Sequence, residues 1–129
     1  MKKLSYLVPL ALTVAAIAVP AASTAPSPVS VSISSNAQYV SPVVILVQVT
    51  VMCPAGHAFT VSDNVFEPST SGTGNGFVFS TCTGNAQTLV LTTVANTGAL
   101  FAPGKAFAAA QLFSVQFEDT AQRQIQIGL

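Results

Sequence analysis

Residues Pro42–Cys53 read PVVILVQVTVMC, a nearly continuous apolar run, rich in β-branched residues, that ends on one of only two cysteines in the chain. Such residues favour a pleated strand. From Val47 onward the run alternates, and Gln48, Thr50 and Met52 fall on the polar side. Before Val47 it is apolar on both sides, so that half is expected to be covered on both faces or to lie under a loop. The pattern predicts a central strand with an inner face of Val47, Val49, Val51 and Cys53.

The second cysteine, Cys82, ends a similar run, Phe77–Cys82. Two cysteines in an exported chain are expected to pair with each other, although reactive or metal-binding thiols are an alternative. Closing a loop of this length stabilises a fold by roughly 3 to 4 kcal/mol in the chain-entropy model. We therefore predict a Cys53–Cys82 disulfide that ties two strands together near one end of the domain.

The first residues have the layout of a secretory signal peptide. Lys2 and Lys3 precede an apolar segment, Leu4–Val19, which is followed by small residues up to Ala25. An uncleaved membrane anchor is the alternative, but the segment is shorter than the roughly 20 residues of a spanning helix and contains a proline. We predict a helical signal peptide over 1–25, cut after residue 21 or 23, and one secreted domain over 26–129.

Charged residues are scarce, at 6% of the chain. Without Lys2 and Lys3, Lys105 and Arg123 face four carboxylates, so the mature chain has a net charge of −2. Two cations cannot neutralise several phosphates, which argues against nucleic-acid binding. The same count argues against a polybasic membrane patch. The expected location is extracellular or in the cell wall.

Period-2 patterns separated by Gly, Pro, Asn and Ser clusters predict about seven strands at 8–12-residue spacing, typical of a β-sandwich. Pro68–Gly76 is predicted to be a flexible loop, and Glu118-Asp119 a turn. The chain has no Trp to pack against the disulfide, so the expected all-β, antiparallel sandwich is immunoglobulin-like only in the broad sense. The predicted strands are Val29–Ser34, Pro42–Cys53, His57–Glu67, Phe77–Cys82, Gln87–Val94, Ala106–Phe117 and Gln124–Leu129.

Most phenylalanines alternate within these strands, and we predict that they form the core. Tyr39 and Phe101 lie in or beside predicted loops and are candidates for surface contacts. The predicted aromatic core consists of Phe59, Phe77, Phe79, Phe107, Phe113 and Phe117.

No metal site is predicted. His57 is the only histidine, and one Cys and one His fall short of a four-ligand zinc site. A blue-copper site needs a second histidine, although Met52 is available. Asp63 and Glu67 could hold calcium only loosely, because no calcium-binding loop surrounds them.

No catalytic or cofactor-binding residue is predicted either. His57, Asp63 and a serine form a triad only on paper, because the sequence has no Gly-x-Ser-x-Gly elbow. Glu118 and Asp119 are interpreted as solvated turn residues. The Gly72–Gly76 stretch lacks the lysine and helix of a phosphate-binding loop.

The chain resembles a family of small secreted actinobacterial proteins of uncharacterised function. The shared pieces begin with an opening strand and a β-branched strand ending in Cys. A second Cys, a Pro-Gly turn, an Ala-rich strand and a Gln-Ile-Gln-Ile-like terminus follow. The resemblance implies an extracellular β-sandwich and brings no catalytic residues. In this sequence the pieces are Val29–Ser34, Val43–Cys53, Ser80-Thr81-Cys82, Pro103-Gly104-Lys105-Ala106 and Gln124-Ile125-Gln126-Ile127.

The sequence thus predicts a secreted, non-enzymatic module that binds a protein or glycan outside the cell or in its envelope. A self-associating structural surface protein is the alternative, because Val43–Val51 is uncharged, rich in β-branched residues and free of internal proline. A small enzyme and a protease inhibitor presenting Ser69–Gly76 are weaker alternatives.

Overall fold

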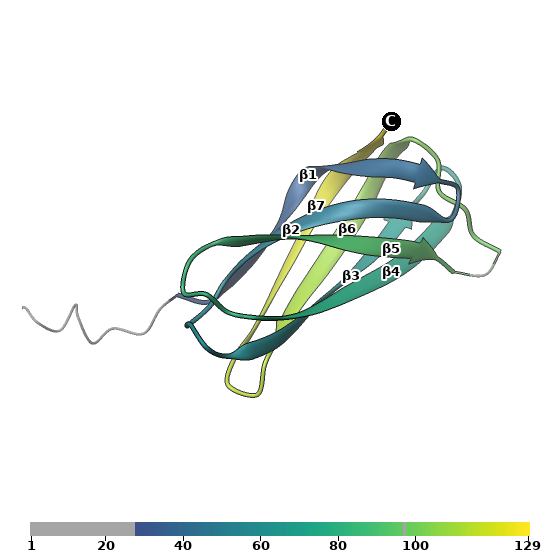
Figure 1. Ribbon diagram of the computed structural model, residues 1–129. Helices are drawn as coiled ribbons and strands as arrows, with labels where there is room; N and C mark the ends of the chain where they lie inside the picture. Colours follow the sequence, from purple (N-terminus) through teal and green to yellow (C-terminus); the bar gives the residue numbers. More distant parts are fainter. Residues whose placement is uncertain (1–27, 97) are drawn as a thin grey trace, which may run out of the picture.

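The computed structural model describes residues 28–96 and 98–129, which form a β-barrel of seven strands (Figure 1). The predicted signal-peptide helix lies outside these residues. The strands are β1 (Ser30–Ser41), β2 (Val44–Met52), β3 (Ala58–Glu67), β4 (Gly72–Thr81), β5 (Gln87–Ala95), β6 (Gly104–Phe113) and β7 (Glu118–Gly128).

Neighbouring strands follow the order β1-β2-β5-β4-β3-β6-β7, and the sheet closes on itself. All pairs are antiparallel except β1 and β7, which run parallel. Figure 1 shows β1, β2, β5 and β4 side by side along the long axis of the barrel. The predictions of an all-β fold with seven strands are confirmed.

The predicted open, antiparallel sandwich is wrong. In an immunoglobulin sandwich the strands divide into two sheets, A-B-E-D and C-F-G. The same two groups of neighbours occur here as β1-β2-β5-β4 and β3-β6-β7. However, β3 and β4 join the two groups, because they pair along their whole length, from Ala58–Thr81 to Glu67–Gly72. The parallel pair of β1 and β7 joins the other side. Neither group keeps a free edge, so the sheet is one mixed barrel.

The seam between β1 and β7 is held partly by charged side chains. Backbone pairing covers only Asn36–Gln38 against Gln126–Gly128. Towards the other end, the Val31 N–H donates to Asp119 Oδ2 over 3.0 Å, and Arg123 Nη1 donates to the Ile33 carbonyl over 3.1 Å. Two side chains therefore bond backbone groups of β1 where no β1–β7 ladder pairs form.

The barrel interior follows the predicted alternation in the first three strands. In β2, Val47, Val49 and Val51 face inward and are buried, as expected, together with Ile45. Val43 is exposed and Leu46 is half-buried, so the start of this run is not covered on both faces. The remaining inward apolar side chains come from every strand except β4: Val31, Ile33, Ala37, Phe59, Val61, Val65, Leu91, Ala106, Ala108, Ala110, Leu112, Ile125 and Ile127.

The inward face of β6 is the opposite of the predicted one. Ala106, Ala108, Ala110 and Leu112 point into the barrel, whereas Phe107 and Phe113 are exposed. Phe77 and Phe79 of β4 are exposed as well. Of the predicted aromatic core, Phe59 is buried and Phe117 is partly buried against the core.

Small residues face inward on β4 because other backbone segments lie directly against it. A Cβ atom on Gly74 would lie only 2.6 Å from the Val94 carbonyl oxygen and 2.8 Å from Cζ of Phe101. Gly72 and Gly76 are buried against backbone carbonyls in the same way. Pro68–Gly76 is therefore not the predicted flexible loop, since β4 begins at Gly72. Phe101 is buried, not a surface contact, and Tyr39 is half-buried against the core.

Candidate binding face

The disulfide lies at one end of the barrel, as predicted. Cys53 and Cys82 follow the ends of β2 and β4, which are not neighbours because β5 lies between them. The intervening turn is tied to the disulfide, because the Gly56 N–H donates to the Cys82 carbonyl (2.9 Å) and the Cys82 N–H donates to the His57 carbonyl (2.8 Å). The bond is compatible with an extracellular location.

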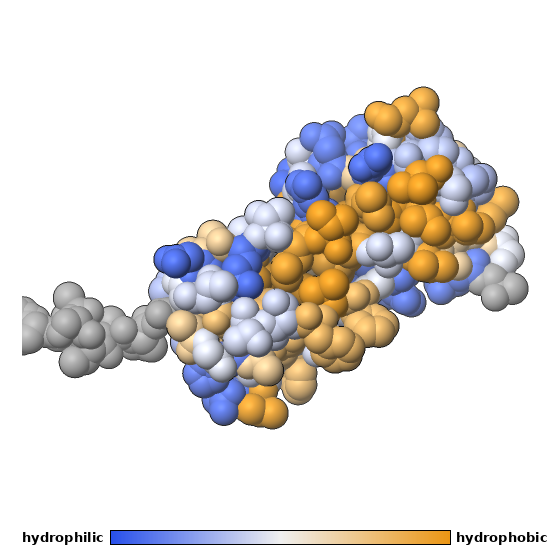
Figure 2. All heavy atoms as spheres, viewed as in Figure 1, coloured by the Kyte–Doolittle hydropathy of each residue, from blue (hydrophilic) through white to orange (hydrophobic). Residues whose placement is uncertain are grey.

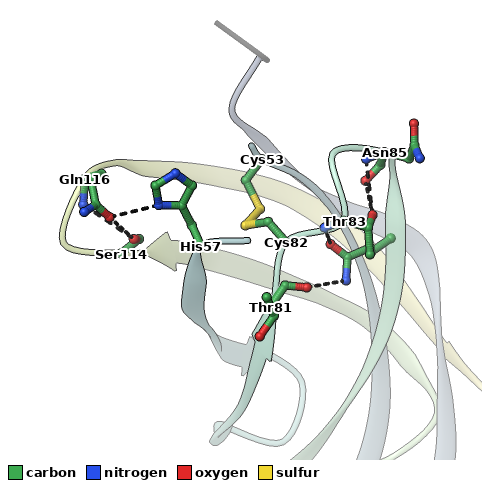
Figure 3. The surroundings of a disulfide bond; sticks show 9 residues. Cys53, His57, Thr81, Cys82, Thr83, Asn85, Ser114 and Gln116 are labelled. Atoms are coloured by element: carbon green, nitrogen blue, oxygen red, sulfur yellow. Dashed lines mark hydrogen bonds between the residues drawn. A yellow bond between two sulfur atoms is a disulfide. The ribbon is translucent and has the colours of Figure 1, made fainter. Parts of the chain in front are cut away.

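His57 points away from the disulfide and towards the turn that precedes β7 (Figure 3). Its Nδ1 lies 3.2 Å from Oε1 of Gln116, and its ring meets Phe117 edge-on with centroids 6.0 Å apart. Within 28–96 and 98–129, no three His, Cys, Asp or Glu side chains are placed to share a metal ion. The contacts of His57 are thus a hydrogen bond with Gln116 and aromatic packing against Phe117.

The structure keeps His57 and Asp63 apart. Six positions separate them on an extended chain, about 20 Å at the rise of a strand. Asp63 points into the barrel and is 1% exposed, and its Oδ2 accepts a 2.6 Å hydrogen bond from Thr93 Oγ1. Burial raises the pKa of Asp63 from 3.8 to about 6, although the hydrogen bond from Thr93 opposes this shift. The triad considered from the sequence does not form.

Glu67 is a second buried carboxylate and lies at the end of β3 that is farther from His57. Its Oε1 accepts the Ala102 N–H over 2.9 Å and the Thr70 hydroxyl over 3.4 Å. It therefore joins the β3–β4 turn to the segment before β6. Asp63 and Glu67 are four residues apart on one strand, about 13 Å, which is too far for a carboxylate pair or a shared calcium ion.

Glu118 and Asp119 are strand residues, not a turn. Glu118 pairs with Phe113 at the start of β7. Asp119 is committed to the β1–β7 seam through Val31. Successive strand residues point to opposite faces, so these two carboxylates do not act together.

The most distinctive surface is the outer side of β4, β3 and β6, which we call the aromatic face. Thr60 pairs with Phe79 on one side and with Phe113 on the other, and two positions along, Ser62 pairs with Phe77. The rings of Phe77 and Phe79 meet edge-on with centroids 5.3 Å apart. At the other end of the face Phe66 pairs with Phe107.

These five phenylalanines are 45–72% exposed. With roughly 200 Å² for each side chain, they present about 550 Å² of apolar surface. This surface is divided into two parts by the row of Asn64: Phe77, Phe79 and Phe113 present about 370 Å², and Phe66 with Phe107 about 190 Å². The larger part is within the size range of the largest apolar patches on soluble monomers, and such patches often bind partners. Figure 2 shows that apolar side chains also continue in a band over β2 and β5, where Val90 and Val94 are exposed.

Sequence reasoning missed this face because it assigned the aromatic residues to the core. A signal was nevertheless present. Gly72, Gly74 and Gly76 on β4, and Ala106, Ala108 and Ala110 on β6, form period-2 sets of small residues. A strand with only small residues on one side is consistent with close approach of another segment on that side.

The described part of the chain contains no helix of the length and hydropathy needed to cross a membrane. No protein-family model matches the chain, and the curated proteins include no detectable relative.

Proposed function

We propose that this protein is a secreted, non-enzymatic binding module that engages an extracellular or cell-envelope partner through the aromatic face. The observation that carries the proposal is the outward placement of five phenylalanines on three adjacent strands, β4, β3 and β6. Exposed apolar surface is energetically unfavourable in water, and a partner that covers it gains roughly 25 cal/mol per Å².

The positions of the titratable groups support a binding role over an enzymatic one. His57 lies at one end of the barrel, Asp63 is enclosed in the interior, and Glu67 holds a turn. General acid–base chemistry requires such groups to converge within hydrogen-bonding reach of a substrate. A signal peptide over 1–25 and membership of the actinobacterial secreted family remain part of this proposal, and the disulfide is compatible with both.

The test is capture from culture and cell-wall fractions with the immobilised, oxidised protein. We expect a discrete protein or glycan to be retained by the unmodified protein and lost with Phe77→Ser/Phe79→Ser. The matched control is Val40→Ser/Val115→Ser, which removes two exposed valines outside the aromatic face. Equal capture by all three proteins would refute a role for the aromatic face.

Self-association is the second candidate, and the charge distribution favours it. In the described ranges Lys105 and Arg123 are balanced by Glu118 and Asp119, while the other two carboxylates are buried. The exposed charges cancel and the net charge of the mature chain is only −2, so electrostatic repulsion between two copies would be weak. Sedimentation velocity at rising protein concentration distinguishes the two candidates. If the unmodified protein forms a dimer and Phe77→Ser/Phe79→Ser does not, the partner of the aromatic face is a second copy of the chain.

A further inference from the structure

A hollow on the outer side of β3, β6 and β7 adjoins the aromatic face. Its central row is Asn64–Ala109–Gln122, three outward residues paired across the strands. Ala109 is small, so this row is lower than the rows on either side of it. We call this hollow the amide trough.

The trough has two connected parts that share its central row. The larger part has a volume of about 590 Å³, and its lining includes Phe66, Phe107 and Gln124. The smaller part has about 200 Å³ and includes Ser62, Gln111 and Thr120. The row of Phe107 and the row of Gln111 are four residues apart on β6, so the trough is about 13 Å long.

Neutral hydrogen-bonding groups dominate the polar lining. Within the described residues the side-chain amides of Asn64, Gln122 and Gln124 form no hydrogen bonds with the protein and are free for a ligand. At the rim, Asn96 is fixed beside Thr73 by two 2.8 Å bonds, one from its backbone N–H to the Thr73 carbonyl and one from its side-chain Nδ2 to the Thr73 hydroxyl. Among the described residues that line the two parts there is no carboxylate.

The one charged residue at the trough is already engaged. Arg123 donates through Nη1 to the Ile33 carbonyl and through Nε to the Gln124 carbonyl, at 3.1 and 3.2 Å. These carbonyl partners are neutral, so Arg123 keeps its charge, but a single cation on a chain of net negative charge does not neutralise a polyanion, and cationic ligands find no carboxylate among the described lining residues. The lining therefore fits a neutral ligand that is rich in hydroxyl groups.

Sugars match this combination of groups. A hydroxyl both donates and accepts, and a side-chain amide offers a carbonyl and an NH₂ group, so one amide can bond two neighbouring hydroxyls. The C–H faces of a sugar ring are apolar and can pack on the rings of Phe66 and Phe107. Ligand sites commonly combine apolar walls with a few polar groups that fix orientation. The open, elongated shape accommodates consecutive units of a chain.

We propose that the amide trough binds a neutral, linear oligosaccharide segment, such as part of an envelope or extracellular polysaccharide. The inference rests on the proposed binding function and names the chemical class of its ligand. The aromatic rings at one end supply apolar contact, and the amides of the central row select hydroxyl groups.

The experiment is affinity electrophoresis of the oxidised protein in native gels that each contain one polysaccharide: mannan, dextran, xylan, arabinogalactan or, as an anionic comparison, heparin. We expect retardation by at least one neutral polymer and none by heparin. Asn64→Ala/Gln122→Ala should weaken binding about 30-fold, since each of the two lost hydrogen bonds is worth roughly 1 kcal/mol. Ala109→Gln should abolish retardation, because the longer side chain fills the trough while no polar group is removed.

The matched control is Gln48→Ala/Gln126→Ala, which removes two exposed amides from a separate hollow that has no aromatic lining. Unfolding curves of all variants verify that they are folded. Retardation by heparin alone, or equal loss in the control variant, would overturn the inference. If no neutral polymer binds while capture through Phe77 and Phe79 succeeds, the oligosaccharide assignment fails and the proposed function stands. If capture fails as well, both fail.

Discussion

The buried carboxylate of Asp63 should make the stability of this protein depend on pH in an unusual direction. Asp63 is enclosed in the barrel, with one oxygen bonded to the Thr93 hydroxyl. Its other oxygen, Oδ1, has no hydrogen-bond partner in the described residues. Removal from water disfavours the charged form and raises the pKa of Asp63 from 3.8 to about 6.

The magnitude follows from linkage between ionisation and folding. A tenfold change in an ionisation equilibrium corresponds to about 1.4 kcal/mol, so this pKa difference is worth about 3 kcal/mol. Because the pKa is higher in the folded state, the folded protein holds its proton more tightly. The contribution of Asp63 to stability is therefore fully present below pH 4 and is lost as the pH rises through 6.

The assay is urea unfolding of the unmodified protein and Asp63→Asn at several pH values from 3.5 to 7.5. The asparagine keeps an oxygen that can accept from Thr93 but does not ionise. The free energy of unfolding of Asp63→Asn relative to the unmodified protein should increase by about 3 kcal/mol from the lowest to the highest pH. Glu118→Gln, which removes an exposed carboxylate, is the control and should show no such trend. A difference for Asp63→Asn that does not change with pH, or that falls as pH rises, would refute the reasoning.

Three further predictions concern the barrel itself. Gly74→Ala should lower the free energy of unfolding by about 1 to 3 kcal/mol because its Cβ would overlap a carbonyl of β5; an unchanged urea midpoint would show that the glycine is not needed for close approach. Cys53→Ser/Cys82→Ser should lower the free energy of unfolding by about 3 to 4 kcal/mol, and reduction of the disulfide in the unmodified protein should lower it by a similar amount. Asp119→Ala should lower the free energy of unfolding by about 1 to 3 kcal/mol and speed hydrogen exchange of the Val31 amide. If the Val31 amide in the variant exchanges as slowly as in the unmodified protein, the hydrogen bond to Asp119 does not protect it.

Local sequence patterns were sufficient for strand content and for the disulfide. In β2 from Val47 onward and in the first half of β3, large apolar residues alternate with polar ones, so the inward face could be predicted from hydropathy there. The pairing of Cys53 with Cys82 followed from there being only two cysteines in a chain expected to be exported. The extent of β4 was harder to predict, because its first residues are Gly, Thr and Asn, which are typical of loops.

The candidate site could not be predicted because hydropathy alone does not decide between two apolar faces of a strand. In β6 the phenylalanines and the alanines are both apolar, and the larger residues were the more plausible core. The aromatic face and the amide trough both depend on the reverse assignment. The amides of the trough come from strands that are distant in the chain, so no sequence motif connects Asn64 with Gln122.

The sequence by itself determined an all-β chain of seven strands, a single disulfide, a surface almost without charge and the absence of a recognisable catalytic motif. Each of these depends on composition or on neighbours within about ten residues. Only the tertiary structure decided the closure into a barrel, the inward direction of the small residues and the exposure of the phenylalanines. The physical reason is packing: β5 and the segment around Phe101 lie against the glycines of β4, leaving no room inside for aromatic rings there. That close approach involves residues far apart in the chain, and no local pattern encodes it.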